Sequence, residues 1–316
     1  MANNAPGKHY RKGISLTGIF KMFPDSDTAE KWFAKQRWGD TPACPHCGSI
    51  NVQTGAKHKT MPYRCREKEC AKRFSVKVGT VMQDSNLDYQ VWGIAMYLMV
   101  TNLKGISSMK LHRELDITQK SAWHLAHRLR EGLKAGNVQF SGPIEVDETF
   151  IGGKRANMSN SKRKALAGTG RGGAGKAIVI GAKDRASNQV SAKTITNTDQ
   201  PTLHGFVGEV VDQASTVYTD DHRGYLGLPN PHKSVKHSVS EYVNGMAHTN
   251  GIESFWALLK RGYHGIYHHM SPKHLQRYVQ EFAGRHNNRE LDTVEMFEDM
   301  AHKMEGKRLT YRELVS

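Results

Sequence analysis

The chain has 316 residues, with 45 Lys and Arg against 30 Asp and Glu and a net charge of +15 at pH 7. Its length allows two or three domains, and its apolar fraction of 38% is not that of a disordered, collagen-like or coiled-coil chain. The longest apolar run, residues 91–100, is far shorter than the roughly 20 residues of a membrane-spanning helix. The N-terminus also lacks the apolar core of a secretory signal. We therefore expect a cytosolic protein, and the charge favours a nucleic-acid partner over an ordinary basic enzyme.

The N-terminal region, residues 1–40, is expected to be an arm followed by a short amphipathic helix. The helix is predicted over Thr28–Trp38 because Asp25, Ser26 and Asp27, all good N-cap residues, come directly before it.

All four cysteines lie within the next segment, residues 41–80. They form two pairs, in CPHC at 44–47 and in CREKEC at 65–70. Because disulfides do not persist in a reducing cytosol, a metal is the better interpretation. Two thiolate pairs supply the four soft ligands of tetrahedral zinc, and four cysteines complete the shell without His46 or His58. We predict a zinc ribbon that depends on structural Zn²⁺ for folding, with these ligands: Cys44, Cys47, Cys65 and Cys70.

The third segment, residues 85–137, has helical periodicity with breaks at Gly105 and near 116–118. Its last part, Ile106–Leu133, is predicted to form two helices that resemble a helix-turn-helix, in which the second helix enters the major groove of DNA. The DNA contacts are expected from the polar face of that helix, namely from Lys120, His124 and Arg128. Helix pairs of this kind also occur in proteins that bind no DNA, and that alternative stays open.

From Pro143 the pattern changes to short strands rich in β-branched residues, followed by helices near 250–261 and 272–286. This order predicts an α+β or mixed α/β domain over 140–290, with 291–316 as a C-terminal tail. Between the first two strands, residues 154–176 carry seven Lys or Arg and no acid. We expect this loop to contact the DNA backbone unless it is merely solvated. The candidate DNA contacts in the loop are Lys162, Arg163 and Lys164, and Arg261 is a further candidate in the helix near 250–261.

The strand-rich segment carries acids at three separate places. Alternation along IEVDETFI puts Glu145 and Asp147 on one face of the first strand and Glu148 on the other. A carboxylate in a central strand is costly unless it is paired or binds a cation. A second strand ends in Asp220 and Asp221, of which Asp221 is the lesser candidate.

The third place is the helix that begins near residue 250. Asn250 and Glu253 share a face of it, and Lys260 lies two turns farther along the same side. Oxygen ligands from three separate elements can hold two Mg²⁺ ions for phosphodiester cleavage. The alternative is that these are surface or salt-bridging acids, as most acids are.

Four stretches together resemble bacterial insertion-sequence transposases of the DDE type, in the group named after the element ISXO-two, which has an N-terminal zinc ribbon. These stretches are VDETFIGGK, VYTDDHRGY, the long run that starts HTNGIESFWALLKRG, and the cysteine segment CPHCGS…YRC…C..RFSVKVGT. The resemblance runs from about Phe23 to Asn288. It implies an α+β multidomain chain with a zinc ribbon, a helical helix-turn-helix-like segment and an RNase H-like catalytic domain. It also implies binding of terminal repeats, strand cleavage that depends on two Mg²⁺ (or Mn²⁺) ions, and transfer of the new 3′-OH into double-stranded target DNA.

Carried over by motif, the metal ligands are Asp147, Asp220 and Glu253, and Lys260 matches the motif's lysine. Asn250 is the alternative third ligand. We favour Glu253 because two Mg²⁺ ions need negatively charged ligands. Paired DNA ends imply a homo-oligomer, for which a dimer is expected, and a place on the nucleoid. Two other functions stay open: a zinc-ribbon DNA-binding regulator whose catalytic domain is inactive, and an RNase H-like structure-selective nuclease.

Overall fold

The computed structural model describes residues 12–134, 136, 139–153, 155–166, 173, 175–235 and 248–316, without the side chains of Arg155 and Lys162. The chain divides into two compact units. The first unit combines Met1–Leu133 with Arg289–Ser316, and the second is Lys134–Asn288.

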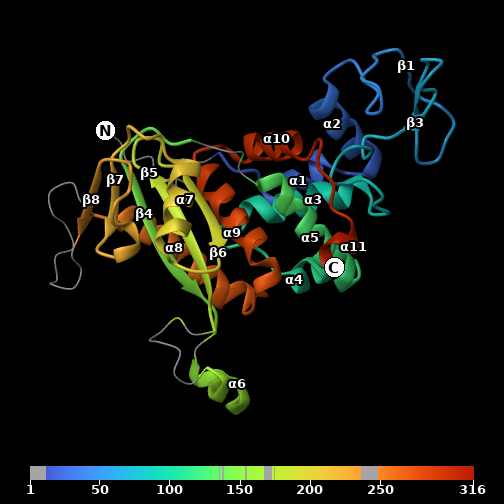
Figure 1. Ribbon diagram of the computed structural model, residues 1–316. Helices are drawn as coiled ribbons and strands as arrows, with labels where there is room; N and C mark the ends of the chain where they lie inside the picture. The colour runs from blue at the N-terminus through green and yellow to red at the C-terminus, as the bar shows by residue number, and fades with distance from the viewer. Residues whose placement is uncertain are drawn as a thin grey trace. The chain divides into compact units, whose positions relative to one another are not determined.

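Helices build most of the first unit (Figure 1). Aromatic and aliphatic side chains from helices far apart in sequence share its core, among them Phe23, Trp92, Leu129 and Phe297. The C-terminal residues are not a simple extension, because two helices form there and α10 packs against α2, α3 and α5. The helices of this unit are α1 (Leu16–Met22), α2 (Ser26–Trp38), α3 (Tyr89–Thr101), α4 (Ser108–Leu115), α5 (Gln119–Leu133), α10 (Thr293–Lys303) and α11 (Tyr311–Val315).

The cysteine segment between α2 and α3 forms a small antiparallel sheet. Its strands are β1 (Val52–Gln53), β2 (Tyr63–Cys65) and β3 (Arg73–Phe74). Tyr63 stacks on Phe74 with ring centroids 5.5 Å apart, and Trp38 meets both rings edge-on. So short a sheet has few other apolar contacts of its own.

The second unit contains a five-stranded sheet in the order β6-β5-β4-β7-β8 (Figure 1). The strands β4, β5 and β6 are antiparallel neighbours, whereas β7 and β8 run parallel to β4. This mixed topology makes β4 the central strand. The strands are β4 (Ile144–Ile151), β5 (Ala177–Asp184), β6 (Val190–Ile195), β7 (Val217–Asp220) and β8 (His232–Val235).

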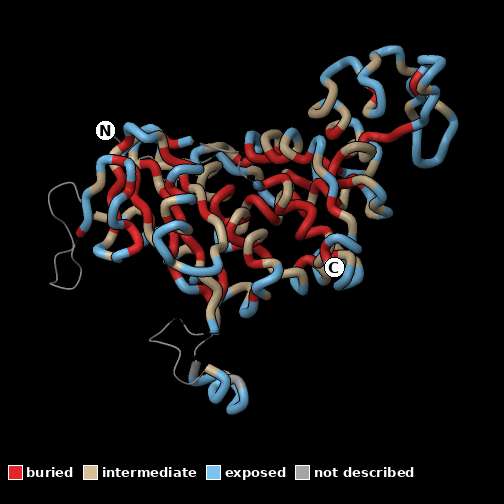
Figure 2. Tube along the Cα trace, viewed as in Figure 1, coloured by how far each residue is buried: buried red, intermediate tan, exposed pale blue. Residues whose placement is uncertain are grey.

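Helices cover both faces of this sheet. On one face α7 (Gln200–Val210) packs through Leu203, Phe206 and Val207 against Ile144 and Val146 of β4. On the other face α8 (Asn250–Gly262) and α9 (Pro272–Asn287) form a second core with β5 and β6. The central strands are accordingly the most buried part of the unit (Figure 2). Shorter elements are α6 (Asn160–Ala165), the 3₁₀ turns at Arg155–Asn157 and Arg223–Tyr225, and a π-helical turn at Tyr263–Tyr267.

The predicted fold class is confirmed: a multidomain α+β chain with a zinc-ribbon cysteine cluster, a helical segment and a mixed sheet. The helix expected over Thr28–Trp38 is α2, and the strands and helices expected after Pro143 are present. The last of the strand-like runs after Pro143, KSVKHSVSEYV at 233–243, is described only as far as Val235, because residues 236–247 lie outside the described part. No helix among the described residues is long and apolar enough to cross a membrane.

Candidate active site

Asp147 lies in the middle of β4, on the face that α8 covers. Its Oδ2 accepts a hydrogen bond of 2.9 Å from the indole Nε1 of Trp256, a residue of α8. Asp147 is paired across the sheet with Gly181 of β5. A Cβ at Gly181 would come within 2.7 Å of the Trp256 ring, so glycine is what lets the indole reach the carboxylate.

Asp220 ends β7, the parallel neighbour of β4. In this ladder Ile144 is paired with Val217 and Glu145 with Tyr218, and continuing the register sets Asp220 beside Asp147. Residues paired across a ladder point to the same face, so the two carboxylates are neighbours. Burial, together with the negative charges of Glu148 and Asp220, raises the pKa of Asp147 to about 7. Two carboxylates that repel each other in a poorly solvated place form a site that a divalent cation would neutralise.

Glu148 joins this acidic cluster from the opposite face of β4. Its Oε2 accepts a 2.6 Å hydrogen bond from the hydroxyl of Tyr225, and its Oε1 lies 4.0 Å from Nδ1 of His222. Burial raises the pKa of Glu148, and the charge of Asp220 raises it further. Glu148 was correctly predicted on the other face of the strand, but it was not among the predicted site residues. Its position directly after Asp147 is the sequence signal that could have identified it as a site residue.

The third predicted acid, Glu253, lies in the first turn of α8 with an exposed side chain. Its Oε1 accepts a 2.9 Å hydrogen bond from the hydroxyl of Thr249. Within the described residues, the four cysteines alone form a group of three or more potential ligands whose atoms lie within 4.8 Å of one another. The structure therefore brings Asp147 and Asp220 together but does not bring the carboxylate of Glu253 to the same point. Asn250 and Lys260 are likewise exposed on α8.

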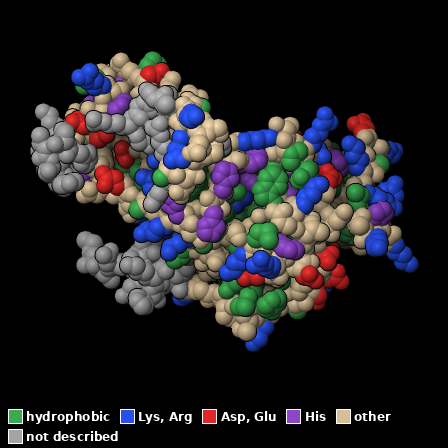
Figure 3. Space-filling view, turned by 90° about the horizontal axis from the view of Figure 1, so that it is seen from below, with side chains coloured by type: hydrophobic (Ala, Val, Ile, Leu, Met, Phe, Trp, Pro, Cys, Tyr) green, Lys and Arg blue, Asp and Glu red, His purple; other side chains and the backbone are tan. Residues whose placement is uncertain are grey.

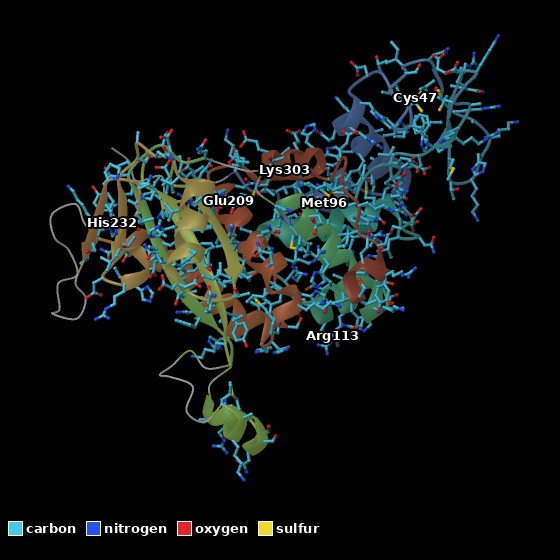
Figure 4. The ribbon with its side chains drawn as sticks, in the orientation of Figure 1. Cys47, Met96, Arg113, Glu209, His232 and Lys303 are labelled. Carbon is cyan, nitrogen blue, oxygen red and sulfur yellow. The ribbon has the colours of Figure 1, made fainter. Side chains whose placement is uncertain are left out.

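The four cysteines are arranged for a tetrahedral metal. The Sγ atoms of Cys44 and Cys70 are 3.8 Å apart, and those of Cys47 and Cys65 are 3.6 Å apart. A tetrahedron of sulfurs with Zn–S bonds of about 2.3 Å has an edge of about 3.8 Å. Cys47 is labelled in Figure 4, and its sulfur lies close to those of its neighbours. These distances support structural Zn²⁺ at the predicted ligands.

The helix pair predicted to bind DNA is present as α4 and α5, and the chain's own C-terminal segment contacts part of the polar face of α5. The backbone carbonyl of Leu309 lies 3.0 Å from Nε of Arg128 and 3.1 Å from Nε2 of His124. The ammonium group of Lys120 lies 4.3 Å from the ring centre of Tyr311. Arg128 is 6% exposed. The C-terminal segment of the same unit thus covers Arg128, whereas Lys120 is exposed.

The other predicted DNA contacts are solvent-facing where their side chains are described. Arg163 and Lys164 are exposed on α6, and Arg261 is exposed near the end of α8; the side chain of Lys162 lies outside the described part. Lys and Arg side chains are spread over the face shown in Figure 3, with acidic side chains between them. The basic character of the surface is therefore distributed over this face.

Comparisons with known proteins agree with this architecture. Residues 139–287 match the ISXO2-like transposase domain, and residues 24–73 match the transposase zinc-ribbon domain. The chain is also similar to an uncharacterized protein in transposable element ISH50 of Halobacterium salinarum. The two are 28% identical over 254 residues, which cover 76% of this chain and 84% of that protein. The first match contains the sheet with Asp147 and Asp220, and the second contains the four cysteines. Residues 139–287 thus belong to the ISXO2-like transposase domain family, and residues 24–73 belong to the transposase zinc-ribbon family.

Proposed function

We propose that this protein binds the terminal inverted repeats of its element and catalyses Mg²⁺-dependent cleavage and strand transfer. The observation that carries the proposal is the meeting of Asp147 and Asp220 on adjacent strands, at a place that raises the pKa of Asp147. Oxygen-only ligands with excess negative charge suit Mg²⁺ or Mn²⁺. When bound there, a pair of such ions activates an attacking oxygen and stabilises the leaving oxygen.

The chain's own residues would divide the work as follows. Asp147 and Asp220 hold the cations, and Glu253, or Asn250 in its place, completes the ligand set from α8. Glu148, held by Tyr225, adds negative charge beside them. Lys260 orients the phosphate from its exposed position two turns beyond Glu253.

Two phosphoryl transfers follow from this arrangement. In the first, a water oxygen attacks the phosphorus at the element end, the bond from phosphorus to O3′ breaks, and O3′ takes up a proton. In the second, this 3′-OH attacks a phosphorus of the target and loses its proton, and the target's own 3′ oxygen leaves. Neither step needs an oxidant or a high-energy cofactor, because the first is a hydrolysis and in the second one phosphodiester bond replaces another.

DNA binding is assigned to the basic surface and the ribbon, with the domains as expected from sequence: ribbon 41–80, helical segment 85–137 and catalytic domain 140–290. Synapsis of two element ends would need at least two protomers, and we propose a dimer. Because its substrate is the cell's DNA, the protein would act in the cytoplasm, on the nucleoid.

The test is a cleavage and joining assay with the full chain, DNA that carries the element ends, and MgCl₂. The wild type should nick at the ends and join them to target DNA. Asp147→Asn should lose both activities at least a hundredfold, while its affinity for end DNA changes less than twofold. End binding without any cleavage would support a regulator, cleavage without joining would support a nuclease, and either result would overturn the proposal.

A further inference from the structure

Glu145 precedes Asp147 by two residues on β4 and points to the same face, yet it takes no part in the acidic cluster. Its side chain is 2% exposed. Its Oε1 accepts a 2.8 Å hydrogen bond from Nε of Arg185, and its Oε2 accepts a 2.9 Å hydrogen bond from the backbone N–H of Ile252 in α8. A buried carboxylate with both oxygens engaged forms a fixed joint between the central strand and this helix.

The start of α8 depends on that carboxylate for capping. The first N–H groups of a helix have no partner within the helix, and an N-cap side chain usually supplies one. Here, within the described residues, Thr249 at the N-cap makes no capping bond to the backbone. Its hydroxyl donates to Glu253 instead. Glu145 of β4 therefore caps the start of α8 from the sheet. Its negative charge also suits the positive end of the helix dipole.

Further contacts close the joint from the side. Arg185 donates from Nη2 to the backbone carbonyl of His248 at 2.6 Å, and its guanidinium lies 4.3 Å from the ring centre of Tyr218. Nδ1 of His248 is 3.3 Å from Oε1 of Glu145. The chain that leads into α8 is thus tied to the same ion pair that caps it.

Gly251 shows how closely the helix approaches. A Cβ at this position would lie 2.7 Å from Oε2 of Glu145 and 3.0 Å from Nζ of Lys183. Only glycine fits there unless the joint opens. This offers a way to disturb the joint without removing any charge.

A second attachment lies one turn farther along α8, where Trp256 donates to Asp147. The two attachment points are two residues apart on the strand, about 6.8 Å, and four residues apart on the helix, about 6 Å. Because these lengths nearly match, both bonds form at once and fix how far α8 can slide along β4. Glu253 lies between Ile252 and Trp256 in sequence, so its backbone position is fixed by the same pair of bonds.

We propose that Glu145 is a positioning residue that holds α8, and with it Glu253, in register against the strand that carries Asp147. The joint itself follows from the contacts above, whereas its effect on cleavage rests on the proposed function. Glu145 would touch neither DNA nor cations.

Two variants test the joint directly. Glu145→Gln removes the charge, and Gly251→Ala forces the helix away from an intact carboxylate. In the metal-free full chain, we expect amide hydrogen exchange at residues 251–254 to become at least tenfold faster in both, with little change in α9. Glu209→Gln, at an exposed ion pair on α7 labelled in Figure 4, is the matched charge control. Unchanged hydrogen exchange at residues 251–254 in both variants would contradict the inference that Glu145 holds the start of α8.

The Mg²⁺ dependence of cleavage separates positioning from simple loss of stability. We expect the MgCl₂ concentration for half-maximal cleavage to rise at least threefold in both variants, with end-DNA affinity within twofold of the wild type. Val207→Ala, in the core on the opposite face of the sheet, lowers stability without touching the joint and should leave that concentration unchanged. An equal rise in Val207→Ala would overturn the positioning role. If the wild type cleaves no DNA, the proposed function fails. The hydrogen-exchange result still shows whether Glu145 holds the start of α8.

Discussion

The raised pKa of Asp147 predicts that the metal-free protein is destabilised by its own active-site charge. The folded-state pKa of about 7 compares with an ordinary value of 3.8. Below pH 4 the carboxyl is protonated in both the folded and unfolded chains and costs nothing. As the pH rises from 4 to 7, the unfolded chain releases this proton while the folded chain retains it, so stability falls. Above pH 7 the loss is constant, at most about 4 kcal/mol from roughly three pH units at 1.36 kcal/mol each.

Asp147→Asn removes this cost and keeps an oxygen that can accept from Trp256. At pH 8 without divalent cations, we expect the second unit, Lys134–Asn288, which contains the five-stranded sheet and is called the sheet unit below, to unfold in the variant at a Tm up to roughly 10 °C higher than in the wild type. Calorimetry with EDTA at pH 4 and pH 8 measures the effect, and the two proteins should converge at pH 4. Adding MgCl₂ should raise the Tm of the wild type more than that of the variant. A variant that is no more stable at pH 8, or that gains equally at pH 4, would refute the electrostatic reasoning.

Three further predictions follow from other contacts. Chelation of zinc should make residues 41–80 sensitive to protease while the Tm of the sheet unit stays unchanged, since so small a sheet depends on its metal; a ribbon that remains protected would argue against zinc. Trp256→Phe keeps an aromatic ring but loses the N–H bond to Asp147 and part of the buried indole, so the metal-free second unit should lose at least about 1 kcal/mol in denaturant unfolding, and no loss would mean that neither the bond nor the packing of the indole is formed in solution. Lys260→Ala should leave the Tm unchanged, because the side chain is exposed, but should slow cleavage at least tenfold at saturating DNA; full activity would remove Lys260 from the site.

Most of the sheet unit could be predicted from sequence because its strands are short, β-branched and separated by turn residues. The alternation in β4 correctly placed Glu145 and Asp147 on one face and Glu148 on the other. The helix α7 was not predicted, although Asp199 accepts from the N–H of Thr202 at its start. No element was predicted for residues 200–210, which lie between two of the predicted strands.

The meeting of Asp147 with Asp220 depends on the parallel pairing of β4 with β7, which local pattern does not encode. The same is true of the indole bond from Trp256 and of the capping role of Glu145, since each joins residues about a hundred positions apart. The resemblance to DDE transposases implied three converging acids. The structure brings together two of them with Glu148, and leaves Glu253 exposed on the neighbouring helix.

The polar face of α5 shows a different limit of sequence reasoning. Both helices of the predicted pair are present, and Leu111, Ala122 and Leu125 pack in the core. The remaining face was assigned to DNA because it is basic. The chain's own C-terminal segment, predicted as a tail, contacts this face through Leu309 and Tyr311 and covers Arg128, while Lys120 is exposed. A basic helix face can thus be satisfied within the chain by a segment nearly 200 residues away.

The central claim is that Asp147 and Asp220 bind divalent cations for DNA cleavage. Its most direct test is a crystal structure of the protein with end DNA and Mn²⁺, using the anomalous signal of manganese. We expect a manganese peak in contact with carboxylate oxygens of both Asp147 and Asp220, and we expect Asp147→Asn to lose it. Manganese peaks elsewhere, with no peak at these two residues in a complex that cleaves DNA, would contradict it.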